Sequence, residues 1–190
     1  MIRHVYLIVL TFILSACTSP SGYLPDLTFK HLPPITLKVS EVQITSGVRN
    51  STQSPNVGHR FPISPEQAVK RWALDRLQVT GAGGIARFTI LQAEATEKKL
   101  TKDENLTGLF KQQASEQYDA SVKARLEIID SRGVKRSQVT AIATWRQNIR
   151  EDASLADRRR IWLELVEKLI TRFNSEMERS IRRFMTDYML

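Results

Sequence analysis

Hydrophobic and polar residues alternate with a period of two along three stretches of the chain. The alternation is clearest over residues 118–130, where six apolar side chains share one face. Residues 86–97 and 139–145 show the same period, which is typical of strands with one buried and one solvated face. The turn Asp130-Ser131-Arg132-Gly133 lies between the stretches 118–130 and 139–145, so we predict that these two pair as an antiparallel hairpin.

An earlier alternation over residues 35–39 resumes out of phase at Val42 and Ile44. A change of phase in such a pattern is typical of a bulge or a break, which we place near Ser40-Glu41. Residues 46–63 are rich in Ser, Asn, Gly and Pro, and we predict that they form a long loop.

Two other segments have apolar residues at helical spacing. Ser64 can cap the first of them and Gln67 can close a capping box, so we predict a helix over residues 64–79. The second segment covers residues 155–188 and follows a similar start, in which Ser154 stands three residues before Asp157.

These elements follow one another in the order βαβββα. Both helices have one apolar face, which must be buried against another layer. We therefore expect an α+β fold: a two-layer sandwich in which two helices cover one face of an antiparallel four-stranded sheet. The other face of the hairpin holds polar and basic side chains and is expected to be solvated.

The charge of the chain indicates the kind of partner. Lys and Arg number 28 against 20 Asp and Glu, a formal net charge of +8. Such an excess favours anionic lipid head groups, anionic glycolipids or an acidic protein surface. Nucleic acid would match the charge equally well, but residues 1–16 have the layout of a secretory signal, and an exported protein rarely meets nucleic acid. We therefore expect a membrane or envelope partner and no nucleic acid.

Cys17 is the only cysteine in the chain. It follows a short segment with the layout of a secretory signal: Arg3 and His4, then about ten apolar residues, too few for the roughly 20 that span a bilayer. Leu14-Ser15-Ala16-Cys17 resembles the lipobox of bacterial lipoproteins. The resemblance implies cleavage before Cys17 and attachment of lipid to its sulfur, and Thr18 at the next position implies the outer rather than the inner membrane.

The lipobox divides the chain into three parts. Residues 1–16 are the expected signal peptide, and residues 17–34 are the lipidated cysteine followed by a flexible, proline-rich tether. Residues 35–190 are expected to form a single periplasmic α+β domain, which is long enough to enclose one hydrophobic core.

Seven arginines are candidates for contact with a polyanion or an acidic partner. They lie on the polar face of the hairpin and near the two ends of the long helix: Arg125, Arg146, Arg158, Arg159, Arg160, Arg182 and Arg183. Those of the helix could equally be solvated surface residues. The apolar end at residues 184–190 could contact a partner or membrane, or pack on the fold. Residues 106–110 are a second small apolar group, either exposed or closing the core.

The sequence contains no pattern typical of a catalytic or metal site. His31 and His59 stand in predicted loops without spaced Cys, Asp or Glu residues, so we expect no metal and no cofactor. Gly81 to Gly84 follow a helix and precede a strand, the reverse of the order in phosphate loops. A hydrolase would require a pocket that joins His59 to a carboxylate and a hydroxyl group.

Outside the lipobox, the chain resembles short uncharacterised lipoproteins from alphaproteobacteria. The resemblance depends on three motifs: Phe61-Pro62-Ile63-Ser64-Pro65, Arg71-Trp72-Ala73 and Tyr118-Asp119-Ala120. In outline the chain is also similar to the lipopolysaccharide-assembly lipoprotein and to auxiliary lipoproteins of ABC transporters. These resemblances imply a non-enzymatic accessory module for binding, assembly or transport. The alternatives are a lipid-anchored hydrolase and a structural envelope lipoprotein.

Overall fold

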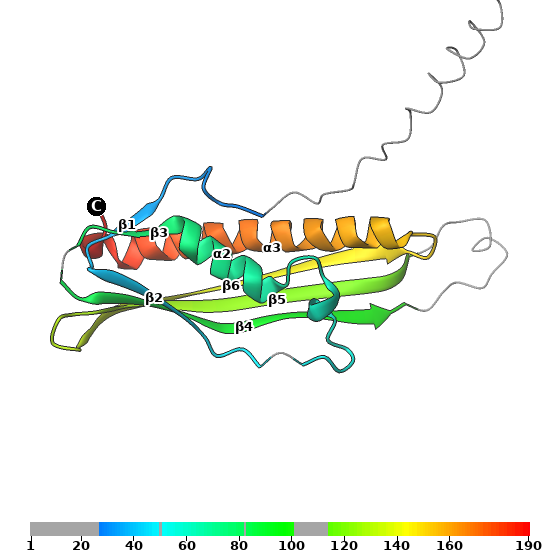
Figure 1. Ribbon diagram of the computed structural model, residues 1–190, viewed down its shortest axis with the longest axis horizontal. Coiled ribbons are helices and arrows are strands. Elements are labelled where there is room, and N and C mark those ends of the chain that lie inside the picture. The colour runs from blue at the N-terminus through cyan, green and yellow to red at the C-terminus, as the bar shows by residue number, and fades with distance from the viewer. Residues whose placement is uncertain (1–26, 50, 82, 101–113) are drawn as a thin grey trace, which may run out of the picture.

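The computed structural model describes residues 27–49, 51–81, 83–100 and 114–190. It contains two long elements of helix and one sheet of long strands (Figure 1). In chain order the elements are β1 (Ile35–Leu37), β2 (Glu41–Ser46), η2 (Gly58–Arg60), α2 (Pro65–Arg76), β3 (Leu77–Val79), β4 (Ile85–Lys99), β5 (Ala114–Ile129), β6 (Lys135–Arg150), α3 (Leu155–Phe184) and η3 (Thr186–Tyr188).

The main sheet has the strand order β2-β4-β5-β6 and is mixed. The pairs β4–β5 and β5–β6 are antiparallel, as predicted for the hairpin, but β2 runs parallel to β4. The expectation of a wholly antiparallel sheet was therefore wrong. Helix α2 lies between β2 and β4 in the chain, and such a crossover returns the second strand in the direction of the first.

The predicted order βαβββα was also wrong, because the first strand is two strands. The break near Ser40-Glu41 is present, and β1 and β2 belong to different sheets. β1 pairs in parallel with β3, with Ile35 opposite Leu77. The predicted helix over 64–79 accordingly ends at Arg76, because its last three residues form backbone hydrogen bonds with β1 instead of continuing the helix.

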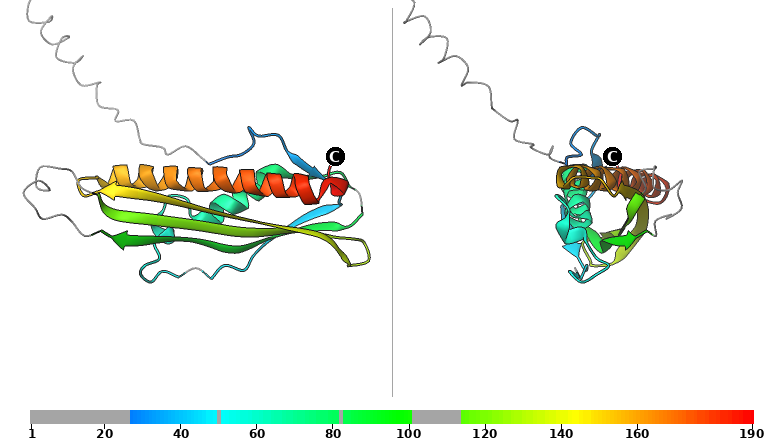
Figure 2. Two further views of the ribbon diagram at one scale, coloured as in Figure 1. Left: turned by 180° about the vertical axis from the view of Figure 1, so that it is seen from behind. Right: turned by 90° about the vertical axis from the view of Figure 1, so that its right-hand side faces the viewer.

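Both helices lie on the same face of the sheet, with α3 over β6 and α2 over β4 (Figure 2). Between the layers is an aromatic cluster. The ring of Phe173 meets that of Trp72 edge-on with centroids 5.1 Å apart, and that of Phe88 with centroids 6.5 Å apart. All three side chains are fully buried, so this cluster joins α2, α3 and β4.

Both helices begin at the predicted caps. The Ser64 hydroxyl accepts a hydrogen bond from the backbone N–H of Gln67, and the Gln67 side chain accepts one from the backbone N–H of Ser64. Ser154 and Asp157 form the same reciprocal box at the start of α3. Each box satisfies two backbone donors that would otherwise lack a partner at a helix start.

The chain already packs on the fold before β1. Residues 27–34 belong to the predicted tether, yet Leu27 and Phe29 are buried. The backbone N–H of Phe29 donates to the Asp75 carboxylate of α2 at 2.8 Å. Among the described residues, the packed part of the chain therefore includes Leu27 and Phe29 of the predicted tether.

The C-terminal end also packs on the fold. Met185 is buried, Met189 bridges to Leu37 of β1, and the Leu190 N–H donates to the Thr36 carbonyl at 3.1 Å. The long helix does not extend beyond the sheet: 30 residues give α3 about 45 Å, whereas the 16 residues of β5 extend over about 53 Å. Among the hydrophobic residues of this end, Phe184 and Leu190 are exposed.

Candidate functional site

A polar cleft lies along the outer edge of β4, where the sheet pairing is interrupted. β2 covers this edge as far as Ile90, and the Gly47 N–H makes the last hydrogen bond there, to the Ile90 carbonyl. The loop returns to the same edge further on, where the Val57 N–H donates to the Ala95 carbonyl at 2.9 Å. Between these points the register shifts after Ile90, and the loop encloses a cleft of about 470 Å³.

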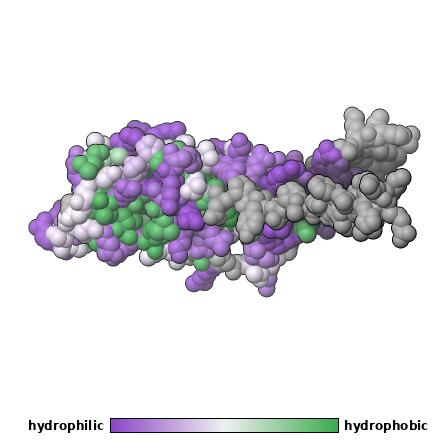
Figure 3. Space-filling view, turned by 45° about the horizontal axis from the view of Figure 1, so that its top comes forward, coloured by the Kyte–Doolittle hydropathy of each residue, from purple (hydrophilic) through white to green (hydrophobic). Residues whose placement is uncertain are grey.

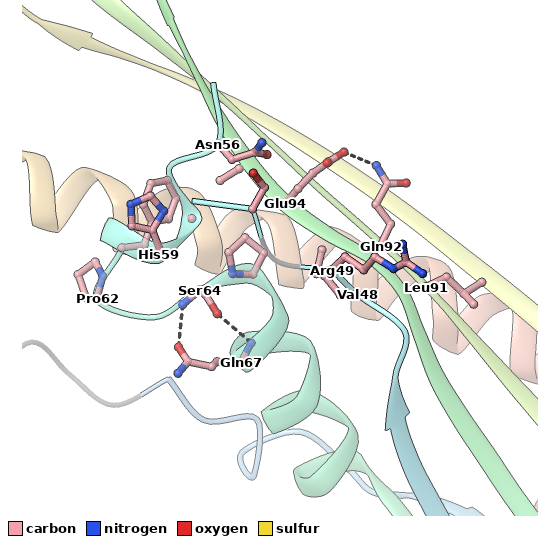
Figure 4. Close-up of a pocket in the computed structure, with 16 residues that line it drawn as sticks. Val48, Arg49, Asn56, His59, Pro62, Ser64, Gln67, Leu91, Gln92 and Glu94 are labelled. Atoms are coloured by element: carbon pink, nitrogen blue, oxygen red, sulfur yellow. Dashed lines mark hydrogen bonds between the residues drawn. The ribbon is translucent and has the colours of Figure 1, made fainter. Parts of the chain in front are cut away.

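The cleft gathers one acidic and several basic or amide side chains from β4, α2 and the loop (Figure 4). These are Arg49, Asn56, His59, Gln67, Gln92 and Glu94. The Glu94 carboxylate is held by the Gln92 amide and by the Ser121 hydroxyl, which donates to it at 3.3 Å. This lining offers both donors and acceptors, so it suits a polar ligand with hydroxyl, amide or anionic groups.

The cleft places His59 near a carboxylate and hydroxyl groups without joining them. Figure 4 shows the Glu94 carboxylate turned toward Gln92, and the Ser64 hydroxyl engaged with the Gln67 N–H at 3.2 Å. Among the described residues, no hydrogen bond links His59 to Glu94 or to Ser64. General-base catalysis requires a hydrogen-bonded nucleophile and base, although such bonds can tighten only when substrate is present.

The cleft continues onto the face of the sheet that no described helix covers. Glu94 also lines a shallow depression on that face, with Asp119, Thr144 and Arg146, and Arg172 of α3 lines it as well. The Arg146 guanidinium donates to the Asp119 carboxylate at 2.6 Å. Burial raises the pKa of Asp119, but its hydrogen bonds from Arg146 and Gln117 outweigh burial and hold that pKa below its usual value.

The sequence predicted Arg125 and Arg146 on this open face, and both lie there. Each stands beside a carboxylate of the same face: the Arg125 Nε lies 3.4 Å from a Glu127 oxygen, and Arg146 is bound to Asp119. Lys123 projects from the same face between them, opposite Ile142. The open face is therefore polar and carries both signs of charge.

Arg158, Arg159 and Arg160 lie together in the first turns of α3 but have different surroundings. Arg158 is mostly buried and bound to Glu116, the third residue of β5. Arg160 bonds to Asp157 at 2.7 Å. Arg159 and Arg160 are both exposed.

Glu116 links Arg158 to the aromatic core. The Tyr118 hydroxyl donates to the same carboxylate at 2.8 Å. Burial alone would raise the pKa of Glu116, but the hydrogen bonds from Arg158 and Tyr118 lower it below the usual value. Burial, together with the hydrogen bond to the Glu116 carboxylate, raises the pKa of Tyr118 well above its usual range. This network fixes the start of α3 against β5.

Arg60 is a further basic residue of this end, next to the His59 that the sequence singled out. Its guanidinium lies 5.5 Å from the ring centroid of Trp162 and 3.0 Å from the Glu97 carboxylate. The ring of Phe61 stacks on the same Trp162 ring, with centroids 5.1 Å apart. Local sequence patterns could not reveal this pairing, because about 100 residues separate Arg60 from Trp162.

Arg182 and Arg183 stand at the opposite end of α3. Arg182 pairs with Glu178 at 2.7 Å, and the Arg183 guanidinium lies 5.1 Å from the ring centroid of Phe184. Twenty-four residues of helix separate Arg158 from Arg182, a distance of about 36 Å. The seven arginines therefore occupy three separate regions, and the structure does not bring them into one site.

Cys17 and the apolar group at residues 106–110 lie outside the described residues. Within the described part of the chain, no helix has the length and apolar content needed to cross a membrane. The same part contains no group of His, Cys, Asp or Glu side chains suited to hold a metal ion.

Fourteen chains of solved structures match this chain, among them two lipoproteins. Rare lipoprotein B from Shewanella oneidensis matches at 12% identity and a TM-score of 0.37, over 73% of this chain and 91% of that one. A minor lipoprotein from Acinetobacter baumannii matches at 11% identity and a TM-score of 0.35, over 78% of this chain and 96% of that one. No protein-family model and no curated protein sequence matches the chain. TM-scores this low do not support an inference about function.

Proposed function

We propose that this protein is a lipid-anchored lipoprotein of the bacterial cell envelope that binds a partner and catalyses no reaction. The anchor rests on Leu14-Ser15-Ala16-Cys17 and on the short apolar stretch before it. Each buried methylene of an acyl chain contributes about 0.8 kcal/mol, so two or more chains at Cys17 hold a domain of this size on a membrane. Thr18 favours the outer membrane, with the domain facing the periplasm.

The observation that carries the binding role is the open face of the sheet. No described helix covers it, and it joins the cleft at the edge of β4 through the shared residue Glu94. The surface is polar, rigid and built on strands of 15 or 16 residues. Rigid sheets position recognition groups more exactly than loops do. The expected partner is an envelope protein or an anionic lipid or glycolipid, in keeping with the net charge of +8.

Site-specific crosslinking of the full-length lipidated protein in its own envelope tests this proposal. A photoreactive amino acid replaces Thr144 on the open face or, as a control, Lys168 on the outer side of α3; both positions are exposed. We expect a defined adduct at position 144, and its loss in the Cys17→Ala background. Equal adducts at both positions, or none at position 144, would overturn a binding role for this face.

One observation favours a second function, a lipid-anchored hydrolase of cell-wall or lipid substrates. The cleft holds His59, Glu94 and hydroxyl groups within one cavity. Purified protein incubated with peptidoglycan fragments or phospholipid would then release product, and His59→Ala and Glu94→Gln would each abolish the release. Lys168→Ala is the control, because Lys168 is exposed on the outer side of α3 and does not line the cleft. Turnover lost with His59 and Glu94 but retained in the control would replace the binding role.

A further inference from the structure

A second exposed surface lies on the helix-covered side of the molecule. Leu74 in the last turn of α2 is 59% exposed, and Val79 at the end of β3 is 42% exposed. Val42, Ile44 and Leu77 line the shallow groove between them. Figure 3 shows the side of the molecule where the described chain begins. Hydrophobic residues, drawn in green, gather on the left half of this view. We call the surface made by these five residues the α2 patch.

Two cations flank the α2 patch. Lys70 and Arg71 precede Leu74 by one helical turn, and both are exposed on the outer side of α2. The neighbouring carboxylate of Glu66 accepts a hydrogen bond from Ser46 at 2.6 Å, and that of Asp75 accepts one from Phe29. No ion pair involves Lys70 or Arg71 within the described part of the chain.

The chain enters the fold beside this patch. The Phe29 N–H bonds to Asp75, which directly follows Leu74 in α2. Ten peptide steps separate Cys17 from Leu27, and a fully extended chain of that length spans at most about 36 Å. That distance is shorter than α3, so a lipid at Cys17 keeps this side of the molecule close to the membrane.

We propose that the α2 patch docks on the surface of an anionic phospholipid bilayer. Leu74 and Val79 enter the boundary between head groups and acyl chains, while Lys70 and Arg71 contact phosphate groups. The inference rests on the lipid anchor of the proposed function and adds an orientation to it. With the α2 patch on the membrane, the open face lies on the opposite side of the sheet and points toward the periplasm, where a partner can reach it (Figure 2).

Single-cysteine labelling of the full-length lipidated protein tests the docking. Cys17 is the only native cysteine, and its sulfur is blocked when it carries lipid. A nitrobenzoxadiazole fluorophore is attached at Leu74→Cys or at Ile142→Cys, which has a similar exposure of 56% but lies on the open face. The protein is reconstituted on vesicles of phosphatidylethanolamine and phosphatidylglycerol that contain spin-labelled lipid.

We expect the emission at position 74 to shift to the blue and to fall about twofold or more through quenching by the spin-labelled lipid. The emission at position 142 should be unchanged. Lys70→Glu with Arg71→Glu, or vesicles of uncharged phosphatidylcholine, should remove most of the quenching at position 74. Circular dichroism verifies that each variant keeps the fold.

The outcomes separate this inference from the anchor itself. Flotation of the unlabelled protein with vesicles, and its loss in Cys17→Ser, tests the anchor alone. Flotation without quenching at position 74 overturns the docking and leaves the anchor standing. A blue shift at position 74 that needs no vesicles and grows with protein concentration shows contact with a second protein copy, which also overturns the docking.

Discussion

Phe173 holds the two layers together, and its replacement by alanine measures how much the aromatic cluster contributes to the fold. The ring is fully buried and lies edge-on to Trp72 and Phe88. Truncating a fully buried phenylalanine costs about 3 to 5 kcal/mol, because transfer free energy is lost and a cavity remains. We expect Phe173→Ala to lower the free energy of unfolding by about 4 kcal/mol, the middle of this range, and part of that loss comes from the two edge-on ring contacts.

Urea unfolding followed by tryptophan fluorescence measures this change. With a slope of about 2 kcal/mol per molar urea, the midpoint should fall by about 2 M. Phe184→Ala is the matched control, because Phe184 is on the same helix but is 60% exposed and contacts mainly the Arg183 guanidinium. It should cost less than about 1 kcal/mol. Similar losses for the two variants would refute the packing of α3 described above.

Three further predictions concern the backbone and the ion pairs. Gly84→Ala should destabilise the folded protein by about 2 kcal/mol or more, because φ is +94° and a Cβ would lie 2.6 Å from the carbonyl oxygen of Ile129, the last residue of β5. In the same unfolding assay, Gly133→Ala should cost only about 1 kcal/mol, because φ is +80° but no atom of the described chain beyond the neighbouring residues lies within 4 Å of the added Cβ. Ser64→Ala removes the cap of α2 and should lower the thermal midpoint by an amount that corresponds to about 1 kcal/mol. The pKa of Glu116 is lowered in the folded state, because its hydrogen bonds outweigh burial. The stability that Glu116 contributes is therefore present above its unfolded-state pKa and is lost as the pH falls through its folded-state pKa. Glu116→Gln should accordingly lose less stability on acidification than the parent, and an equal loss would contradict the role of Arg158.

Local chemistry was sufficient to predict the hairpin and both helix starts. The alternation over 118–130 and 139–145 lies in β5 and β6, apart from Asp130 just after β5, and the two strands pair as expected. Both capping boxes form because cap and partner are three residues apart, so their geometry depends on one helical turn alone. Strand geometry is also local, because successive side chains alternate between the two faces of a sheet. The positions of Arg125 and Arg146 on the polar face therefore followed from the period of two.

The candidate site was only partly predictable. The sequence singled out His59 and a polar sheet face, but the cleft that places His59 near Glu94 depends on a loop that leaves and rejoins β4. Arg158 looked like a solvent-facing cation in a basic run. Its partner Glu116 is 42 residues away, and no local pattern reports such a separation.

By itself, the sequence of this protein determined the elements that depend on neighbouring residues: strand period, helix faces, caps and turns. The tertiary structure alone decided the parallel pairing of β2 with β4, the conversion of 77–79 from helix to strand, and the ion-pair partners of the arginines. The reason is that a backbone or side-chain group forms whichever bond the folded chain places within reach, and residues distant in sequence then compete with local preferences.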